Sequence, residues 1–162
     1  MFGHIVMIFT QMQQGHMDNL KNIGFALAKV TTEQFAIIAE NFKNGSEIKL
    51  HINFRFAADN KQKVVAVFNS FVFETEEKQF LLIEAGCHFA IAPDSWEKMY
   101  DKELNKLVVP KGFLQHMGML TVGTNRGILH AKTENTNFNQ FHIPTVNVAE
   151  LIKNDSVFEF KK

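Results

Sequence analysis

The chain has 162 residues, the usual size of one domain, and its 17 Lys and Arg balance its 17 Asp and Glu, so the formal net charge is zero. This balance excludes a strongly basic nucleic-acid-binding protein and gives no electrostatic attraction to an acidic membrane surface. The single cysteine, Cys87, excludes an internal disulfide and a multi-cysteine zinc site. It also favours a reducing, cytoplasmic compartment.

The apolar composition is unusual. The chain has 17 Phe but one Trp and one Tyr, and it has seven Met. Phe rings carry no polar group, and Met is a flexible side chain that adapts to irregular surroundings. Such residues can fill a core, and they also suit a surface that accommodates varied apolar partners.

Residues 1–21 are expected to form an N-terminal arm or an extra strand, and residues 22–162 a single domain. The apolar run from Gly3 to Phe9 has no preceding basic residue and is too short for a secretory signal. No segment approaches the roughly 18 consecutive apolar residues of a membrane span, so membrane insertion is not expected.

Four strands are predicted between residues 23 and 91. From Ile23 the pattern becomes regular, with Phe25 and Leu27 alternating with smaller residues, and residues 34–38 continue as an extended or irregular segment. Residues 48–56 alternate strictly between apolar and polar side chains, which is typical of a strand with one wet face. Residues 64–73 and 80–91 are rich in β-branched and aromatic residues. Short polar links, among them Asn44-Gly45, separate these strands and indicate an antiparallel meander or Greek key.

Helices are expected after Pro93. Asp94 and Glu97 fit a capping box that opens a helix extending to Leu107. A second helix is predicted from about Lys111 to Thr124 and is expected to stop at residues 125–127, Asn-Arg-Gly. Residues 132–140 are predicted to be a polar loop, and Asn147 with Glu150 to open a short helix ending at residue 152. Strands followed by helices indicate an α+β domain.

The sequence offers little sign of catalysis. Cys87 and His88 are neighbours on a predicted strand, so their side chains point to opposite faces and cannot act together. The seven histidines lack metal-ligand spacing, which predicts no metal site. The segment 122–127 follows a helix and lacks the Lys-Ser/Thr pair of a phosphate loop. No paired carboxylates, triad or cofactor loop is present, so neither an enzyme nor a cofactor is expected.

The order of these motifs resembles the SecB family of bacterial export chaperones from about residue 23 to residue 152. Four strands precede the helices, and the fourth ends in Phe-Ala-Ile at residues 89–91. The second helical part opens at Val-Val-Pro, residues 108–110, and is followed by Arg126-Gly127. The segment 144–151 is similar to the Pro-x-x-Asn-x-x-x-Leu pattern that opens the final helix of the family.

This resemblance implies a four-stranded antiparallel Greek-key sheet with helices on one face, assembled as a dimer of dimers. SecB-like proteins hold unfolded polypeptides in apolar grooves without hydrolysing nucleotide. The resemblance therefore implies unfolded or nascent polypeptides as partners, passed on to a translocase motor in protein export or to another client system such as antitoxins.

Candidate client-binding residues are apolar side chains near the ends of predicted strands and helices. For each one, a place in the core is the alternative interpretation, because apolar residues are usually buried. The candidates are Phe54, Phe56, Phe71, Phe73, Phe89, Trp96 and Met99.

The helix predicted from Lys111 is apolar nearly all round, which one sheet cannot cover, so a homo-oligomer is expected. Phe113, Met117 and Leu120 are the candidate interface residues. A different class of function remains open: a small-ligand or enzymatic domain with a cleft between sheet and helices. Its best candidates are His116, His130 and Arg126. A structural oligomer with no client is a third alternative.

Overall fold

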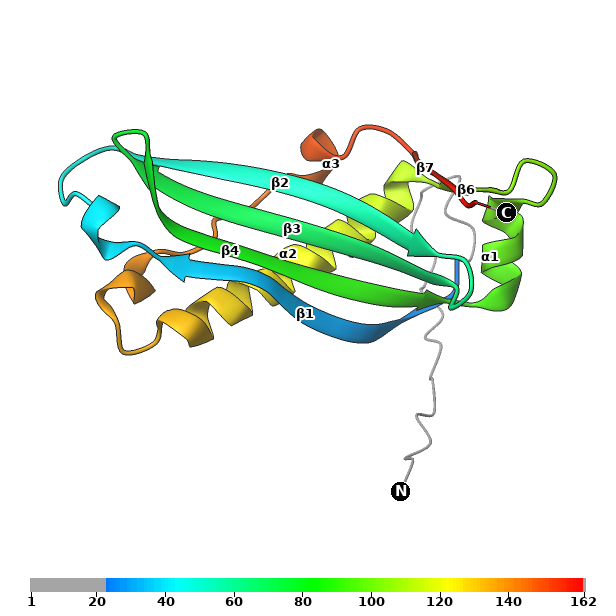
Figure 1. Cartoon of the computed structure of the whole chain (residues 1–162), viewed down its shortest axis with the longest axis horizontal. Helices are drawn as coiled ribbons and strands as arrows, with labels where there is room; N and C mark the ends of the chain where they lie inside the picture. Colours follow the sequence, from blue (N-terminus) through cyan, green and yellow to red (C-terminus); the bar gives the residue numbers. More distant parts are fainter. Residues whose placement is uncertain (1–22, 162) are drawn as a thin grey trace, which may run out of the picture.

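A long four-stranded antiparallel sheet dominates the structure (Figure 1). The computed structural model describes residues 23–161. The strands are β1 (Phe25–Ile37), β2 (Ile48–Asp59), β3 (Val64–Thr75) and β4 (Lys78–Ile91), arranged in the order β1-β4-β3-β2. The expected arm over residues 1–21 lies outside the described residues.

The three strands β2, β3 and β4 follow each other through tight turns. Gly45, in the link before β2, has φ +84°, a conformation that favours glycine. The β3–β4 turn places Glu76 and Glu77 at positive φ, so the chain reverses within two residues. β1 pairs with β4 with two register shifts, next to Ala28 and Glu33, and these irregularities explain why its alternation is hard to read in the sequence.

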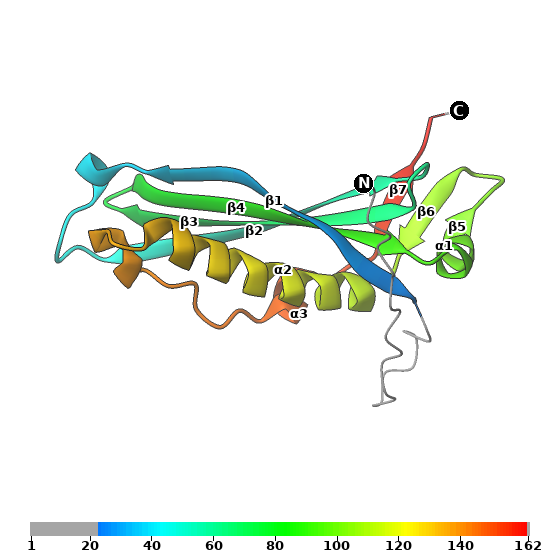
Figure 2. The ribbon, with the colours of Figure 1, turned by 90° about the horizontal axis from the view of Figure 1, so that it is seen from below.

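One face of the sheet is covered by the 23-residue helix α2 (Lys111–Thr133), which runs along its length (Figure 2). The buried side chains of β3 and β4 that point to this face include Phe71, Ile83 and Phe89, all at 0% exposure. They pack with Leu114 and Met117 of α2 to form the core. The chain is therefore α+β, with its main core between one sheet and one helix.

A smaller unit closes one end of the sheet (Figure 1). It consists of α1 (Pro93–Met99) and a three-stranded sheet of β5 (Tyr100–Asp101), β6 (Lys106–Val109) and β7 (Ser156–Glu159) in the order β5-β6-β7. The short helix α3 (Val148–Leu151) packs on α2, where Gly118 gives it room: a Cβ there would lie 3.0 Å from Val148 and from Ile152. Two 3₁₀ turns, η1 (Ala39–Asn41) and η2 (Asn137–Gln140), lie at the opposite end.

The predicted helix from Asp94 to Leu107 is wrong beyond Met99. A carboxylate oxygen of Asp101 accepts hydrogen bonds from the backbone N–H of Glu103 (2.9 Å) and Leu104 (3.0 Å), and Asn105 adopts φ +53°. These interactions form a turn between β5 and β6. The helix α1 also begins without a side-chain cap, after Ala92, so the predicted capping box is not formed.

The predicted stop at residues 125–127 is also wrong, because α2 continues to Thr133. The buried Asn125 side chain donates a hydrogen bond to the carbonyl of Asn69 on β3 (2.7 Å). This contact between the helix and the sheet holds Asn125 in place. The residues predicted as a polar loop contain the end of α2 and the turn η2. The short helix α3 follows Asn147 as predicted, but without a side-chain cap, and β7 was not predicted.

Candidate functional site

Five of the seven predicted client-binding residues lie in the core. Phe71, Phe89 and Trp96 are fully buried, Phe73 is 4% exposed and Met99 is 9% exposed. Their burial leaves no side-chain surface for a partner, so the alternative interpretation, ordinary core packing, applies to these five residues.

The other two candidates, Phe54 and Phe56, are half-buried on β2 and pack against the edge of the core. The strand β2 alternates as predicted, with its apolar side chains toward α2 and its polar side chains exposed. Phe54 lies next to α2, since a Cβ on Gly118 would be 3.4 Å from the Phe54 ring. Phe54 therefore helps seat α2 on the sheet.

The three residues predicted for an oligomer interface also differ in burial. Phe113 and Met117 are buried within the chain, and the Phe113 ring packs edge-on against Phe25 with 5.2 Å between centroids. Only Leu120 of the three is exposed, at 43%. The side of α2 that faces solvent is exposed at Met119, Leu120, Gly123, Arg126, Gly127 and His130, and its apolar part, Met119 with Leu120, is hereafter the α2 stripe.

A cluster of five phenylalanines, hereafter the Phe cluster, lies at the end of the sheet that carries η1 and η2. Its ring centroids are 4.9–6.2 Å apart, in edge-on and tilted arrangements that aromatic rings favour. Phe73 and Phe80 come from β3 and β4, and they are buried. Phe42 follows η1, and Phe138 and Phe141 belong to the segment at η2.

An open hollow of about 520 Å³, hereafter the Phe42 hollow, lies beside this cluster. Phe42 lines it, and the surrounding side chains are neutral and polar: Asn44, Thr136, Asn137 and Gln140. Phe42 and Phe138 are half-buried, so part of the aromatic surface remains accessible. The hollow thus combines an apolar wall with amide groups that can both donate and accept hydrogen bonds.

The loop that carries Phe42 is tied to the β3–β4 turn. The Asn41 side chain donates to the carbonyl of Gln79 (2.7 Å), and Thr75 donates to the carbonyl of Asn41 (2.9 Å). The ammonium of Lys43 bonds the carboxylate of Glu76, and this contact, more than any other, lowers the pKa of Glu76 below its ordinary value. These contacts hold one wall of the hollow in place.

Sequence reasoning missed Phe42, Phe138 and Phe141. Phe42 stands next to the Asn44-Gly45 turn, and the other two lie in an Asn-rich segment that was predicted to be a polar loop. The signal that could have identified them was the pair of phenylalanines three residues apart in a polar segment. A side chain of that size in a loop is usually buried against something.

The residues proposed for a ligand cleft do not meet. His116 packs against the ring of Phe25, with centroids 5.7 Å apart, whereas the exposed His130 lies beside Asn139. Along one helix these two histidines are separated by roughly 20 Å, given 1.5 Å per residue. Arg126 donates to the carbonyls of Ile143 and Pro144, both at 3.0 Å. Each side chain serves a separate local contact.

The face of the sheet opposite α2, which no element of residues 23–161 covers and which is hereafter the uncovered face, carries a cluster around Phe68. The guanidinium of Arg55 lies 3.7 Å from the centre of the Phe68 ring and bonds Glu84 (2.7 Å). His88 packs edge-on against the same ring. Burial lowers the pKa of His88, and the charge of Lys29 lowers it further. This cluster explains why Phe68 is 7% exposed on a face without a helix.

Cys87 and His88 point to opposite faces of the sheet, as predicted: Cys87 is 1% exposed, in the core, and His88 is on the uncovered face. Within residues 23–161, no group of three or more His, Cys, Asp and Glu is placed to hold a metal ion. None of the helices in that range is both long and apolar enough to cross a membrane.

The sequence matches no protein-family model, and no curated protein matches it.

Proposed function

We propose that this protein is a SecB-like chaperone module that binds unfolded or nascent polypeptide, with the Phe42 hollow as its client site. One observation carries the proposal: the half-buried rings of the Phe cluster remain partly accessible in the Phe42 hollow, next to neutral amide side chains. An aromatic wall accepts many apolar side chains, and amides satisfy both the N–H and the C=O groups of an extended backbone. Such a site favours unfolded chains of varied sequence.

The topology supports the SecB-like part of the proposal. In a Greek key, three consecutive strands are joined by hairpins and a fourth lies beside one end of them by a longer connection. The order β1-β4-β3-β2 fits this description, with η1 and the following loop as the connection between β1 and β2. The resemblance also implies helices on one face of the sheet, and the long helix α2 lies on one face.

The exterior supports a partner-binding role. Within the described part of the chain, residues 23–161, nine large apolar side chains are exposed by 40% or more. They are Leu27, Val30, Ile48, Leu104, Val108, Met119, Leu120, Leu151 and Val157. Isolated exposed apolar residues are ordinary, so the weight falls on Met119 and Leu120, which are neighbours in the α2 stripe. That stripe supports an interface between copies of the chain, and we propose the dimer of dimers that the resemblance implies.

The partner systems remain those implied by the resemblance. We propose a cytoplasmic protein whose clients pass either to a translocase motor or to an antitoxin-type pathway. The alternative, a small-ligand or enzymatic domain, has less support because His116, Arg126 and His130 do not converge on one cavity.

The test combines aggregation and cross-linking. The full chain, at a near-stoichiometric ratio, is expected to suppress aggregation of a chemically denatured client, and no suppression at any ratio would contradict the function. For the site, Gln140→Cys carries a photo-activated cross-linker at the rim of the Phe42 hollow, and Gln62→Cys carries it at an exposed turn at the other end of the sheet. The buried Cys87 is not expected to be labelled.

An unfolded client of net positive charge, which the lysines on either side of Gln62 do not attract, is expected to cross-link to the Gln140 position several times more efficiently than to the Gln62 position. Folded client should cross-link to neither. Equal cross-linking of unfolded client at both positions would contradict the assignment of the hollow, even where aggregation is suppressed.

A further inference from the structure

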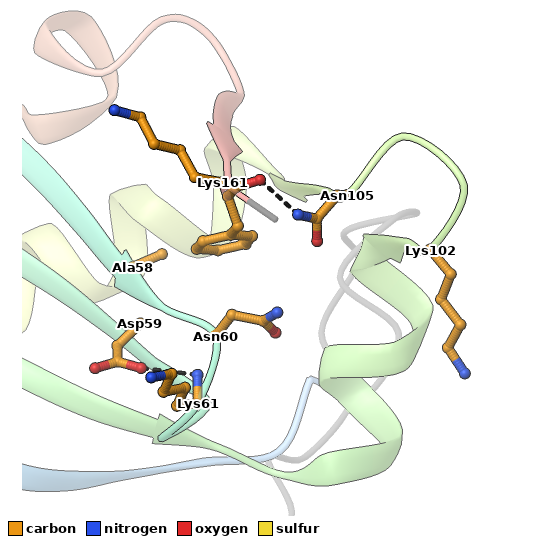
Figure 3. A pocket seen from close by; sticks show the side chains of 8 residues that line it. Ala58, Asp59, Asn60, Lys61, Lys102, Asn105 and Lys161 are labelled. Carbon is orange, nitrogen blue, oxygen red and sulfur yellow. Dashed lines mark hydrogen bonds between the residues drawn. The ribbon is translucent and has the colours of Figure 1, made fainter.

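A second hollow, hereafter the C-terminal pocket, lies at the other end of the sheet (Figure 3). Its volume is about 640 Å³. Three segments meet around it: the β2–β3 turn, the β5–β6 turn and the segment that follows β7. Its lining consists of Ala58, Asp59, Asn60, Lys61, Lys102, Asn105, Phe160 and Lys161.

The two asparagines of the pocket are fixed by a chain of hydrogen bonds. The Asn60 oxygen accepts from the indole N–H of Trp96 (3.2 Å) and from the ammonium of Lys63 (2.9 Å), and its amide nitrogen donates to the hydroxyl of Tyr100 (3.4 Å). That hydroxyl donates to the Asn105 oxygen, and the Asn105 amide nitrogen donates to the carbonyl of Phe160. Among residues 23–161, each amide nitrogen makes one of these bonds and carries two hydrogens, so one N–H of each has no partner there and can bond a ligand.

The lining of the pocket carries more positive than negative charge, because it holds three lysines and one aspartate. Asp59 accepts hydrogen bonds from the backbone N–H groups of Lys61 (2.8 Å) and Gln62 (2.9 Å). Lys102 is paired with Glu97 at 2.7 Å. Among residues 23–161, no ion pair involves Lys61 or Lys161, so a net positive charge remains at the pocket after the carboxylate of Asp59 is counted. The whole chain has no net charge, so this positive site is a local feature.

Figure 3 shows that the lysines do not converge on one point. Lys102 and Lys161 extend outward from the rim, while Asn60 reaches into the space between the turn and the C-terminal segment. A small anion at the asparagines would not reach both rim lysines, whereas an extended chain with several carboxylates would. Flexible lysine stems can follow such a chain, and the ring of Phe160 gives it an apolar wall.

We propose that the C-terminal pocket binds an acidic polypeptide segment, whose carboxylates contact Lys61, Lys161 and the free N–H groups of Asn60 and Asn105. This site is separate from the Phe42 hollow, which lies at the opposite end of the sheet and has a neutral lining. The protein would therefore hold an apolar client at one end and an acidic chain at the other.

The probe is a fluorescently labelled hexaglutamate peptide, titrated against the full chain at low salt and followed by anisotropy. Trp96 is the only tryptophan and bonds Asn60, so its emission gives a second readout at the pocket. The double variant Lys61→Glu/Lys161→Glu is expected to weaken binding at least tenfold. The matched control is Lys78→Glu, at an exposed lysine on the β3–β4 turn, which should change binding less than twofold.

Three results would overturn the proposal. The first is no binding of hexaglutamate up to millimolar concentration. The second is an equal loss in Lys78→Glu and in a Lys61→Glu single variant, which would assign binding to overall charge. The third is displacement of the peptide by inorganic phosphate at equal concentration, which would make the pocket a site for small anions. Binding that decreases with salt and is lost only in the pocket variants supports it.

Discussion

Gly86 lies on β4 directly beneath the ring of Phe68, on the uncovered face of the sheet. A Cβ at this position would come within 2.7 Å of two ring carbons of Phe68 and within 2.8 Å of the Thr31 hydroxyl. The ring cannot move away freely because the Arg55 guanidinium covers its other side at 3.7 Å. Glycine is therefore required here for close approach and not for a positive φ.

We expect Gly86→Ala to lower the free energy of unfolding by about 1–3 kcal/mol, the usual cost of overpacking. Urea unfolding followed by the emission of Trp96 measures the change. Gly123→Ala is the matched control, because a Cβ there meets nothing within 4 Å and Gly123 faces solvent in the interior of α2. That substitution should stabilise the chain by roughly 0.5–1 kcal/mol. Equal effects of the two substitutions would contradict this account of Gly86.

At the scale of the elements, Arg126 connects α2 to the extended segment that follows η2. Its Nε and one terminal nitrogen donate to the carbonyls of Ile143 and Pro144, so one planar side chain holds two successive peptide groups. Arg126→Ala is expected to cost about 1 kcal/mol and to increase hydrogen exchange in residues 141–147. Arg126→Lys keeps the positive charge but removes the planar guanidinium that donates to two carbonyls at once. Protection that is retained in the lysine variant would show that charge alone holds the segment.

The elements also show what sequence patterns can and cannot predict. The strands β2, β3 and β4 were predicted nearly to their ends, because period-2 alternation and β-branched content arise from burial on one face of a sheet. The existence of a helix after Pro110 was predicted for a similar reason. In each case the local pattern and the tertiary environment agree.

Where the local pattern and the tertiary environment disagree, the prediction is wrong. Residues 125–127 carry a local stop signal, but the bond from Asn125 to β3 and the packing of the last two turns against the sheet keep α2 helical. The spacing of Trp96, Met99 and Leu107 fits a helix, yet Leu107 reaches the core from β6, paired with Phe158 of β7. That pairing joins residues some fifty positions apart, which no local window contains.

The candidate site was harder to predict for the same reason. The Phe42 hollow combines η1, the loop after it and η2, which come together only in the folded chain. Apolar bulk alone selected Phe71, Phe89 and Trp96, but the size that makes a side chain a good contact also favours its burial.

For the molecule as a whole, the question is which surface another copy would cover. β1 is a long edge strand, but its two register shifts and its charged Lys29 and Glu33 are features that discourage edge-to-edge pairing. The α2 stripe has no such protection. Met119 is 55% exposed and Leu120 is 43% exposed, and the exposed Arg126 on the same side of the helix is engaged with the carbonyls of Ile143 and Pro144.

We therefore expect light scattering at micromolar concentration to give about four times the 18.5 kDa mass of one chain. Leu120→Glu should shift the mass toward one or two chains, because a carboxylate in an apolar interface loses its hydration without a partner. Leu104→Glu is the control, since Leu104 is 63% exposed on the β5–β6 turn, away from the stripe. A wild-type monomer would contradict the proposed assembly, and an equal effect of both substitutions would place the interface elsewhere. Because Leu120 makes no contribution to the buried core, its substitution separates assembly from folding.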